Sequence, residues 1–417
     1  MKKTFQIIIT LLLTDFCLFP IALNAYPAYN FKTIMACVGL LTAFMDMLAR
    51  RRAILSRTLF DLTIYAGLLS FIAYISTVYN GTNDNTLVTY VISAWVWFFA
   101  AYVVIRYMRR THGEVSLTLI GRYLVAVCVM QCILAVMIDR IPSFALAVRN
   151  IFFLPSADRL AMARRLYGIG AELDIAGIRF SCVLVILIHL MLKDQAMHSN
   201  RLTTWYWLAF LLITVVGCMI ARTTIVGSGL GVAYYVIETM RRSGRHGLAY
   251  SLVKGMIVFI FILFIAVVAS VYLYSTDASF REHIEFGFEG FFNYFESGSF
   301  ETGSTNTLQT MYVFPEKLKT WIIGDGLFYE GSHFYMWTDV GYLRFIFYFG
   351  LVGLTDFILL YVYMMRRGRH FFPEDKKLFL LLFLVNMIVW LKVATDTFVV
   401  FMLLMNTGIQ KDEEAVV

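Results

Sequence analysis

Long hydrophobic runs recur along the whole chain and are separated by short polar segments. Most runs are close to the roughly 20 residues that a helix needs to cross the hydrocarbon core of a bilayer. The pattern predicts about twelve membrane-spanning helices, at residues 5–24, 31–49, 58–78, 87–107, 117–138, 176–192, 203–220, 223–239, 256–274, 339–364, 378–392 and 395–410. The last two are the weakest, because VWLKVATDTFVV (389–400) also fits a turn or one interrupted helix.

The composition agrees with this pattern. Of the 417 residues, 60% are hydrophobic and 15% are charged, whereas soluble domains average about 45–50% and about 25%. No internal repeat and no low-complexity linker divides the chain. We therefore expect an all-α fold over residues 1–417, as a single integral membrane domain built from a polytopic bundle of transmembrane helices.

The first 25 residues, MKKTFQIIITLLLTDFCLFPIALNA, also resemble a signal peptide, with a basic start and an apolar core. Asp15 interrupts that core, and the apolar stretch is long for a signal peptide. A retained first span is the favoured interpretation, and the rest of the topology is the same in either case.

The net charge of +7 is distributed in clusters between the hydrophobic runs. Five of these clusters are MKK at the start, ARRRAILSR (49–57), RYMRRTH (106–112), MRRSGRH (240–246) and MMRRGRH (364–370), and they alternate with basic-poor turns such as YNGTNDN (79–85). Loops rich in Lys and Arg stay in the cytoplasm. The amino terminus and, for an even number of spans, the carboxyl terminus are predicted to be cytoplasmic. The basic residues thus set the orientation, and we expect no nucleic-acid partner.

Residues 139–175 form the first notable extracytoplasmic loop. Ser156 is suited to cap a short helix after Pro155, with Asp158 in its first turn. A helix lying on the membrane surface explains an apolar stripe there, made of Leu160, Ala163, Leu166 and Tyr167. Five arginines lie on this outer side against the usual charge rule, namely Arg140, Arg149, Arg159, Arg164 and Arg165. They indicate an anionic partner, and acidic lipid headgroups are the simplest one.

Residues 275–338, between spans nine and ten, form the largest loop. Loops of this length are usually functional or disordered, and the many aromatic residues argue against disorder. Aromatic rings interleaved with Asp, Glu, Asn and Thr suit sugar rings, whose C–H faces stack and whose hydroxyls need polar partners. The same aromatic residues also fit an interfacial belt.

Three arginines lie near the predicted outer boundary of the membrane: Arg179 in AGIRFSCVLV, Arg222 in GCMIARTTIVG and Arg344 in TDVGYLRFIF. Charged residues inside spans are costly and usually face the bundle interior or a wet cavity. A single arginine of this kind most often reaches toward lipid phosphates. Several at one level, with His333 and Asp339 nearby, favour a site for a lipid-linked phosphate or diphosphate, because the guanidinium fork matches phosphate oxygens. Histidine is the side chain best suited to take a proton near neutral pH.

Metal chemistry has no support in the sequence. The six cysteines all fall inside apolar runs, at positions 17, 37, 128, 132, 182 and 218, and are best explained as small buried hydrophobic residues. No metal site is expected, and neither is a nucleotide cofactor. The GSGLG stretch lacks the Lys-Ser/Thr of a phosphate loop, so Gly227 and Gly231 are expected to mediate close helix packing.

Four features together resemble the O-antigen polymerase and ligase superfamily of bacterial inner-membrane glycosyltransferases. They are RFS (179–181), ARTT (221–224), the large outer loop between two late spans, and TDVGYLRFIFYFGLVGL (338–354). Their order is similar over roughly residues 170–360. The resemblance implies a bacterial inner-membrane enzyme without metal or cofactor, acting at the outer face. Its substrate would be an oligosaccharide repeat unit on undecaprenyl diphosphate, and the expected function is to polymerise such units into a surface polysaccharide. A chain-length regulator and a repeat-unit flippase would be its partners.

The resemblance also implies roles for residues. Arg179 and Arg222 would bind the diphosphate, and His333 or Asp339 would act on the acceptor hydroxyl, with Arg344 as a phosphate or structural partner. Arg164 and Arg165 are further candidates for binding substrate. The base stays open among Asp325, Glu330, His333 and Asp339, and an Asp339–Arg344 ion pair at the helix start is the structural alternative.

Two other functions stay open. A ligase would pass the glycan to a final acceptor, and a histidine in the large loop fits that class. A transporter or flippase would instead show polar residues at the bilayer midplane and inverted repeats. Close packing of the tenth span is expected at Gly350 and Gly353.

Overall fold

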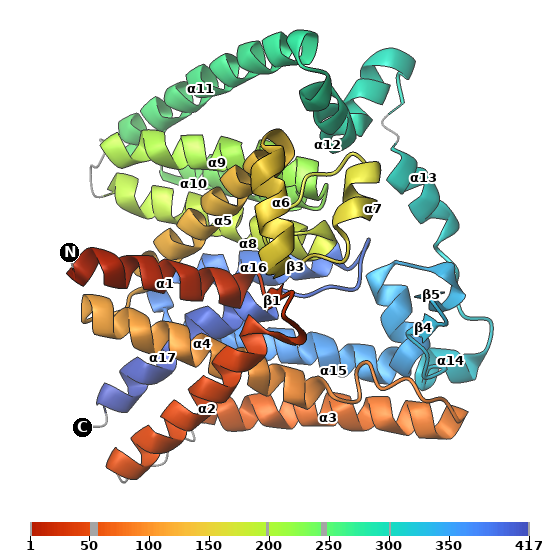
Figure 1. Cartoon of the computed structure of the whole chain (residues 1–417). Helices are drawn as coiled ribbons and strands as arrows, with labels where there is room; N and C mark the ends of the chain where they lie inside the picture. Colours follow the sequence, from red (N-terminus) through yellow and green to blue (C-terminus); the bar gives the residue numbers. More distant parts are fainter. Residues whose placement is uncertain (1, 51–56, 197–199, 243–247, 300–301, 416–417) are drawn as a thin grey trace. The chain divides into compact units, whose positions relative to one another are not determined.

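The computed structural model describes residues 2–50, 57–196, 200–242, 248–299 and 302–415 (Figure 1). The described chain is mostly helical, and a helix lies at each of the predicted spans. These helices are α1 (Lys2–Leu18), α2 (Phe31–Arg50), α3 (Arg57–Asn80), α4 (Tyr90–His112), α5 (Leu117–Arg140), α8 (Leu173–Ala196), α9 (Asn200–Ile220), α10 (Thr224–Arg242), α11 (Leu248–Thr276), α15 (Gly341–Phe371), α16 (Lys376–Val389) and α17 (Phe398–Ala415). The all-α prediction is confirmed.

Within the described residues, eight helices are long and apolar enough to cross a membrane. They are α2, α3, α4, α5, α8, α9, α11 and α15, and they indicate a multi-pass membrane protein. Crossings by α1, α10, α16 and α17 remain predictions. In α11, none of the residues of the apolar window between Lys254 and Thr276 is buried, as expected for a helix whose sides face lipid.

The predicted first span is too long at its carboxyl end. Helix α1 stops at Leu18, and residues 22–23 form strand β1 (Ala22–Leu23). This strand pairs antiparallel with β2 (Tyr26–Asn30) and with β3 (Phe152–Phe153). Pro20 lacks an N–H to continue the helix, which explains why the apolar run changes structure here. Residues 389–400, where the sequence left open a turn or one interrupted helix, separate two helices, α16 and α17.

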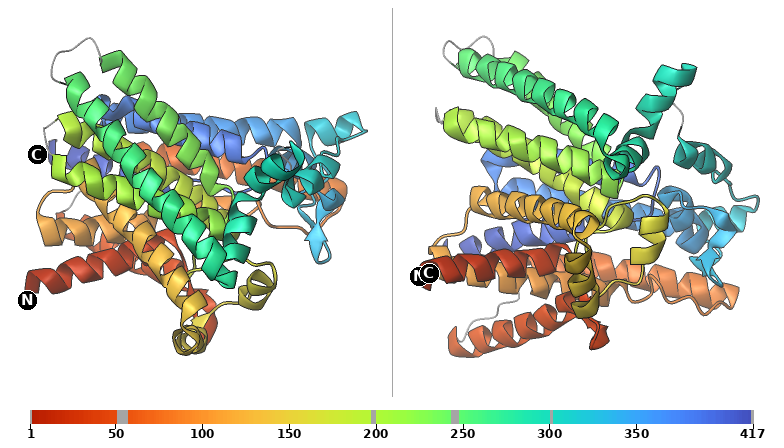
Figure 2. Two further views of the ribbon diagram at one scale, coloured as in Figure 1. Left: turned by 90° about the horizontal axis from the view of Figure 1, so that it is seen from above. Right: turned by 45° about the horizontal axis from the view of Figure 1, so that its top comes forward.

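The chain divides into two compact units that interleave along the sequence. The first unit holds residues 1–10, 31–115 and 302–417, and the second holds residues 11–30 and 116–301. In the first unit, α15 packs along α3 (blue and orange in Figure 1) and also against α16 and α17, while α2 packs along α4. In the second unit, α8 packs against α5, α9 and α10. Every residue from 176 to 192 is buried, so α8 forms the core of that unit. Helices α9, α10 and α11 (green) lie side by side in both views of Figure 2.

The two predicted loops contain more regular structure than their sequences suggested. Residues 139–175 hold α6 (Pro142–Ile151), which the hydrophobic pattern missed, and α7 (Ala157–Met162). Ser156 precedes α7, but its side chain accepts no cap hydrogen bond. Leu160 and Tyr167 of the apolar stripe pack on Ile138 and Val148, while Ala163 is exposed. Contact within the protein therefore explains most of the stripe.

The segment 275–338 is divided between the two units. Its first part forms α12 (Ala278–Ser297) in the second unit. Its second part lies in the first unit and forms α13 (Gly303–Thr310), α14 (Leu318–Ile322), strands β4 (Tyr329–Glu330) and β5 (His333–Phe334), and a 3₁₀ turn over Tyr335–Trp337. Most of the residues described here lie in these elements, in line with the aromatic content that argued against disorder.

Helix α15 breaks at Gly350, where φ is 68° and ψ is −172°. The break leaves carbonyl groups of the preceding turn open to other donors. The N–H groups of Asp325 and Gly326 donate to the carbonyls of Phe347 and Tyr348 at 2.6 and 3.1 Å. Gly350 was predicted to allow close packing against neighbouring helices, and its backbone does lie against the carbonyl of Ile322 at the end of α14. The break at Gly350 thus allows the segment after α14 to pack against α15.

Gly350→Ala should be strongly destabilising, whereas Gly67→Ala in α3 should not. A Cβ at position 350 would lie 2.1 Å from the carbonyl oxygen of Ile322, and this φ/ψ region is essentially restricted to glycine. We expect a loss of about 2–4 kcal/mol in the free energy of unfolding. A Cβ at Gly67 meets nothing within 4 Å, so that change should stay within about 1 kcal/mol. Thermal unfolding in detergent checks this, and equal midpoints for both variants would contradict it.

Candidate functional site

The seven candidate residues fall into the two units, which are described separately. The first unit holds three of them and the second unit holds four: His333, Asp339 and Arg344 in the first, and Arg164, Arg165, Arg179 and Arg222 in the second.

In the first unit, His333 lies on a short antiparallel hairpin. Its partner across the two strands is Glu330, and Gly331 in the turn has a φ of 61°. The hairpin is anchored at Asp84, whose Oδ2 accepts from the N–H groups of Phe328 and Tyr329 at 2.6 and 3.0 Å. Burial alone would raise the pKa of Asp84, but hydrogen bonds from Thr86, Phe328 and Tyr329 outweigh burial and lower it. A charged carboxylate therefore holds the base of the hairpin.

Arg344 supports the same hairpin from α15. Its guanidinium carbon lies 3.8 Å from the ring centre of Phe328 and 3.7 Å from that of Phe334. One of its nitrogens lies 3.4 Å from Asp339, and only 5% of its surface is exposed. The ion pair forms because Val340 is not helical and α15 begins at Gly341, so Asp339 lies before the helix. The structural alternative is confirmed, and the predicted phosphate role of Arg344 gains no support from this geometry.

His333 has one ring nitrogen engaged and one open. Its ring stacks on Trp337 with a centroid distance of 3.8 Å, and Nδ1 lies 3.2 Å from the carbonyl oxygen of Phe334. Because a carbonyl only accepts, Nδ1 carries the proton in the neutral ring and Nε2 carries the lone pair. Nε2 forms no hydrogen bond with any residue that the structure describes. The tautomer required of a general base is therefore set by the backbone.

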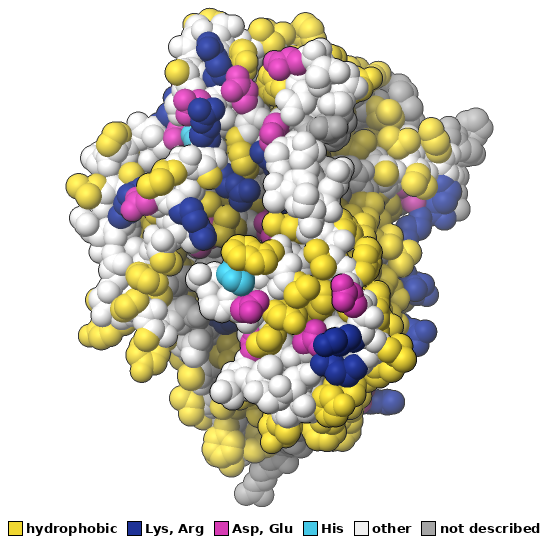
Figure 3. All heavy atoms as spheres, turned by 90° about the vertical axis from the view of Figure 1, so that its right-hand side faces the viewer, with side chains coloured by type: hydrophobic (Ala, Val, Ile, Leu, Met, Phe, Trp, Pro, Cys, Tyr) yellow, Lys and Arg dark blue, Asp and Glu magenta, His cyan; other side chains and the backbone are white. Residues whose placement is uncertain are grey.

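The turn that follows β5 is strained. Met336 and Trp337 have φ values of 56° and 54°, which non-glycine residues rarely adopt and which cost about 1–3 kcal/mol each. Trp337 is nevertheless 68% exposed, so burial of its ring does not offset that cost. On the face shown in Figure 3, which carries this hairpin, hydrophobic, acidic and basic side chains are intermingled. Strain of this kind is typical of functional segments.

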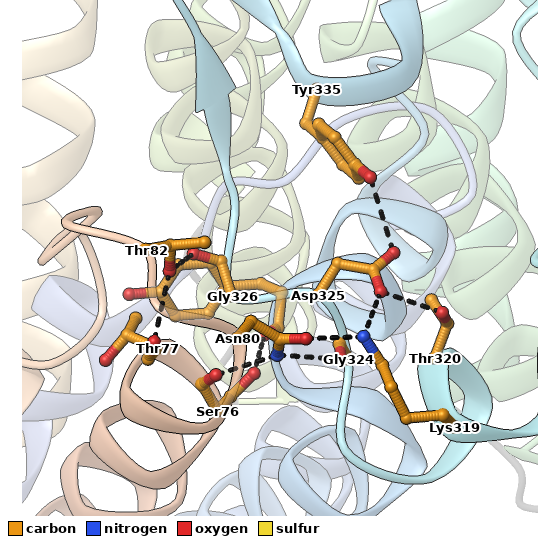
Figure 4. A network of polar contacts seen from close by, with 11 residues as sticks. Ser76, Thr77, Asn80, Thr82, Lys319, Thr320, Gly324, Asp325, Gly326 and Tyr335 are labelled. Carbon is orange, nitrogen blue, oxygen red and sulfur yellow. Dashed lines mark hydrogen bonds and ion pairs between the residues drawn. The ribbon is translucent and has the colours of Figure 1, made fainter.

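A second polar network lies beside the hairpin (Figure 4). The carboxylate of Asp325 accepts hydrogen bonds from Lys319 at 2.7 Å, Thr320 at 2.8 Å and Tyr335 at 3.4 Å. Lys319 also donates to Asn80 at the end of α3. Among the four candidates for the base, Asp325 pairs with Lys319 and Asp339 with Arg344. His333 has no such pair among the described residues, and neither has Glu330, which is exposed.

In the second unit, Arg222 lies in the tight turn between α9 and α10. Its Nε donates to the carbonyl of Phe286 at 2.8 Å, and Nη2 lies 2.5 Å from Glu289. The guanidinium carbon lies 4.2 Å from the ring centre of Phe286. Burial lowers the pKa of Arg222, the charge of Glu289 opposes this, and the charge of Arg165 lowers it further. The guanidinium stays charged in every relevant condition.

Arg165 lies against the same ring, 4.8 Å from the centre of Phe286. Burial lowers its pKa, and the charge of Asp174 counteracts this. Its guanidinium forms no hydrogen bond or ion pair with any residue that the structure describes. We call the set of Arg165, Arg222 and Phe286 the arginine site. Two partly desolvated guanidinium groups at one ring, one of them with free donors, are suited to bind an anion.

Arg179 and Arg164 occupy different surroundings. Arg179 is buried in α8, with 7% of its surface exposed, and its guanidinium lies 5.8 Å from the ring centre of Phe19. Arg164 is mostly exposed, 3.9 Å from Glu282. Within this unit the structure brings Arg165 and Arg222 together at Phe286, whereas Arg179 lies at Phe19 and Arg164 at Glu282.

The two short motifs behind the family resemblance are in direct contact. The hydroxyl of Ser181 donates to the carbonyl of Thr223 at 2.8 Å and accepts from the N–H of Gly227 at 3.1 Å. A Cβ at Gly227 would lie 2.2 Å from the Cα of Ser181. The close packing expected at this glycine is therefore confirmed, between α10 and α8.

Sequence reasoning missed several polar partners. Asp174 accepts from Thr223 at 3.1 Å and Glu289 pairs with Arg222, while His283 and Asp139 bond each other at 2.9 Å. None of these pairs has a characteristic spacing, because their members lie between 45 and 145 residues apart or on different elements. The only signal was the unusual density of charged residues in segments predicted to be outside the membrane.

Of the six cysteines, five are buried as expected, but Cys37 is exposed. Over the described ranges no group of three or more His, Cys, Asp or Glu side chains could hold a metal ion.

In comparisons with known proteins, no protein-family model, no curated protein and no solved structure matches the chain.

Proposed function

We propose that the protein is a membrane glycosyltransferase that polymerises oligosaccharide repeat units carried on undecaprenyl diphosphate. The product would be a surface polysaccharide, assembled at the outer face of the bacterial cytoplasmic membrane. The observation that carries the proposal is the arginine site, where Arg165 and Arg222 meet at Phe286 and Arg165 keeps its donors free. A diphosphate is the anion that a lipid-linked donor would present to these groups.

In the proposed reaction, a hydroxyl of the acceptor glycan attacks the anomeric carbon of the donor. The bond from that carbon to the diphosphate oxygen breaks, and the undecaprenyl diphosphate leaves with the bonding electrons. Charge develops on the leaving oxygen, and the arginine site would stabilise it. Within the first unit, His333 is the proposed base for an attacking hydroxyl, because its bond to Phe334 leaves Nε2 open.

A ligase is the second candidate, because the same chemistry transfers the glycan to a final acceptor. The open Nε2 of His333 supports both candidates equally, since each needs a base for a hydroxyl. They differ in product: a polymerase lengthens the chain on its carrier, and a ligase changes the anchor. The arginine site and the His333 hairpin do not favour a transporter, which would need polar groups along a path through the membrane.

Deletion of the gene, followed by complementation, separates the candidates. Surface glycan and lipid-linked glycan are resolved by size on gels. Single repeat units in place of a ladder would establish a polymerase, whereas full-length chains left on the carrier lipid would establish a ligase. An unchanged ladder would contradict both the polymerase and the ligase and would favour a transporter.

A further inference from the structure

His283 connects three segments of the second unit at a point close to the arginine site. It lies in the first half of α12, three residues before Phe286, so both side chains are on one side of the helix. Its Nε2 is 2.9 Å from Oδ1 of Asp139 at the end of α5, and its Nδ1 is 2.9 Å from the carbonyl oxygen of Arg164. Both ring nitrogens therefore face oxygen atoms that only accept.

An imidazole can donate from both nitrogens only when it is protonated. Burial lowers the pKa of His283, but the hydrogen bonds to Asp139 and to the Arg164 carbonyl, together with the charge of Asp139, outweigh burial and raise it. The other charged groups near this ring belong to the same three segments. Arg140 pairs with Asp139 and with Asp277, and Glu282 lies 3.9 Å from Arg164. The surroundings thus favour the imidazolium.

The carbonyl that His283 binds belongs to a strained residue. Arg164 has a φ of 55°, a left-handed conformation that costs a non-glycine residue roughly 1 kcal/mol or more. This conformation turns the chain immediately before Arg165, whose side chain lies at Phe286. The Arg164 carbonyl bonds His283, while the N–H groups of Arg164 and Arg165 donate to the carbonyls of Ala161 and Leu160 within the same turn. His283 thus adds a long-range support to the turn from which Arg165 approaches the ring.

We propose that His283, as an imidazolium, is the positioning residue of the arginine site, and that the site loses affinity for diphosphate when this ring loses its proton. The proposal rests on the proposed function in naming diphosphate as the anion. It goes beyond that function in making binding depend on a group that does not touch the ligand.

The direction of the pH effect follows from the bonds. Below the raised pKa of His283, both hydrogen bonds are present and the turn is held. Above it, one nitrogen becomes an acceptor that faces another acceptor. The carboxylate of Asp139 competes better for the remaining proton, so the Arg164 carbonyl loses its donor. Binding should therefore be strong at low pH and weaken as the pH rises through the pKa of His283.

Two measurements on the full chain in detergent test the proposal. The first is binding of farnesyl diphosphate by calorimetry between about pH 6 and about pH 9. The second is hydrogen exchange of the peptide 157–167 without ligand, corrected for the intrinsic pH dependence of exchange. We expect the wild type to lose about tenfold in affinity, and protection of that peptide, over the same pH range.

His283→Gln can keep one donor but cannot titrate, so it should bind about tenfold less tightly at low pH. Its affinity should then change with pH only as the ionisation of the ligand itself requires. Asp139→Asn keeps the histidine but removes the charge that stabilises the imidazolium, so it should move the loss to lower pH. His370→Gln, at an exposed histidine of the first unit, is the control and should match the wild type.

The outcomes separate this inference from the proposed function. If the wild type binds farnesyl diphosphate and His283→Gln follows the same pH profile, the positioning role is wrong. If the peptide 157–167 responds to pH as expected but the wild type binds no farnesyl diphosphate, the diphosphate role of the arginine site, and with it the proposed function, is wrong.

Discussion

Arg222→Ala is expected to abolish the glycan ladder in complemented cells while the protein remains in the membrane. The substitution removes a guanidinium that is placed by Phe286 and Glu289, and with it one of the two positive charges at the arginine site. Loss of one donor that stabilises developing charge typically costs about 10²–10³-fold in rate. The measurement is the size distribution of the polysaccharide at equal protein level, determined by quantitative blotting of membranes.

Arg222→Lys tests whether activity needs the planar guanidinium group or only its positive charge. Lysine is a point charge and cannot bond Phe286 and Glu289 and still offer a planar pair of donors to phosphate. We expect activity close to that of the alanine variant. Arg281→Lys is the matched control, because Arg281 contacts Tyr274 and lies outside the arginine site. A lysine variant as active as the wild type at position 222 would mean that only net charge is needed there.

His333→Gln is expected to lower the rate of polymerisation by about 10²–10⁴-fold, the usual contribution of a general base. Glutamine has nearly the same length and retains a donor for the Phe334 carbonyl, but it has no nitrogen that accepts a proton. The hairpin should survive, because Asp84 and Arg344 hold it through groups other than His333. The assay is incorporation of labelled repeat units in membrane vesicles that contain each variant.

Trp337→Phe and Asp325→Asn are the controls for the proposed role of His333 as the base. The first keeps an aromatic ring beside His333 and should reduce the rate only mildly. The second removes the negative charge of a carboxylate that pairs with Lys319, so its main effect should be on thermal stability. A rate in His333→Gln equal to the wild type, or a larger loss in Asp325→Asn at full stability, would move the role of base to another residue.

The fold class could be predicted from the hydrophobic pattern because each run is long enough to be a helix and nothing else in the chain competes. The pattern failed at Pro20, where an apolar run changes from helix to strand without any loss of hydrophobicity. At Gly350 the pattern indicated close packing but not the break in the helix. A glycine in an apolar run has the same appearance whether it lies in a helix or breaks one, and the difference here depends on the distant carbonyl of Ile322.

The candidate site was only partly predictable. Arg222 attracted attention because charge near a membrane boundary is costly, and Arg165 because it lies on the outer side against the usual charge rule. The structure places both at Phe286. Arg344 attracted attention for the same reason but supports a hairpin through Phe328 and Phe334. The cost of a buried charge shows in a sequence, whereas the groups that compensate for it depend on tertiary structure. His283 was missed because its significance lies in two acceptors far away in the chain.

The interleaved order of the two units has a consequence for synthesis. Residues 116–301 of the second unit emerge from the ribosome after α2, α3 and α4 but before α15. The main partner of α3 within its unit is α15, so α3 must wait in the membrane while the 260 residues from 81 to 340 are made. Ser76 on α3 needs the carbonyl of Tyr348 as its acceptor, and Arg367 of α15 donates to Thr58.

Until α15 has been made, the first unit is incomplete, and the polar groups of α3 face lipid, other helices or an insertion chaperone. Long-range pairing of this kind is slow to form and leaves intermediates exposed. The second unit, in contrast, receives most of its helices consecutively and can assemble as they emerge. Chains that end near residue 301 should therefore contain one assembled unit and one that quality-control proteases recognise, which makes the carboxyl-terminal helices the step that protects the newly made protein from degradation.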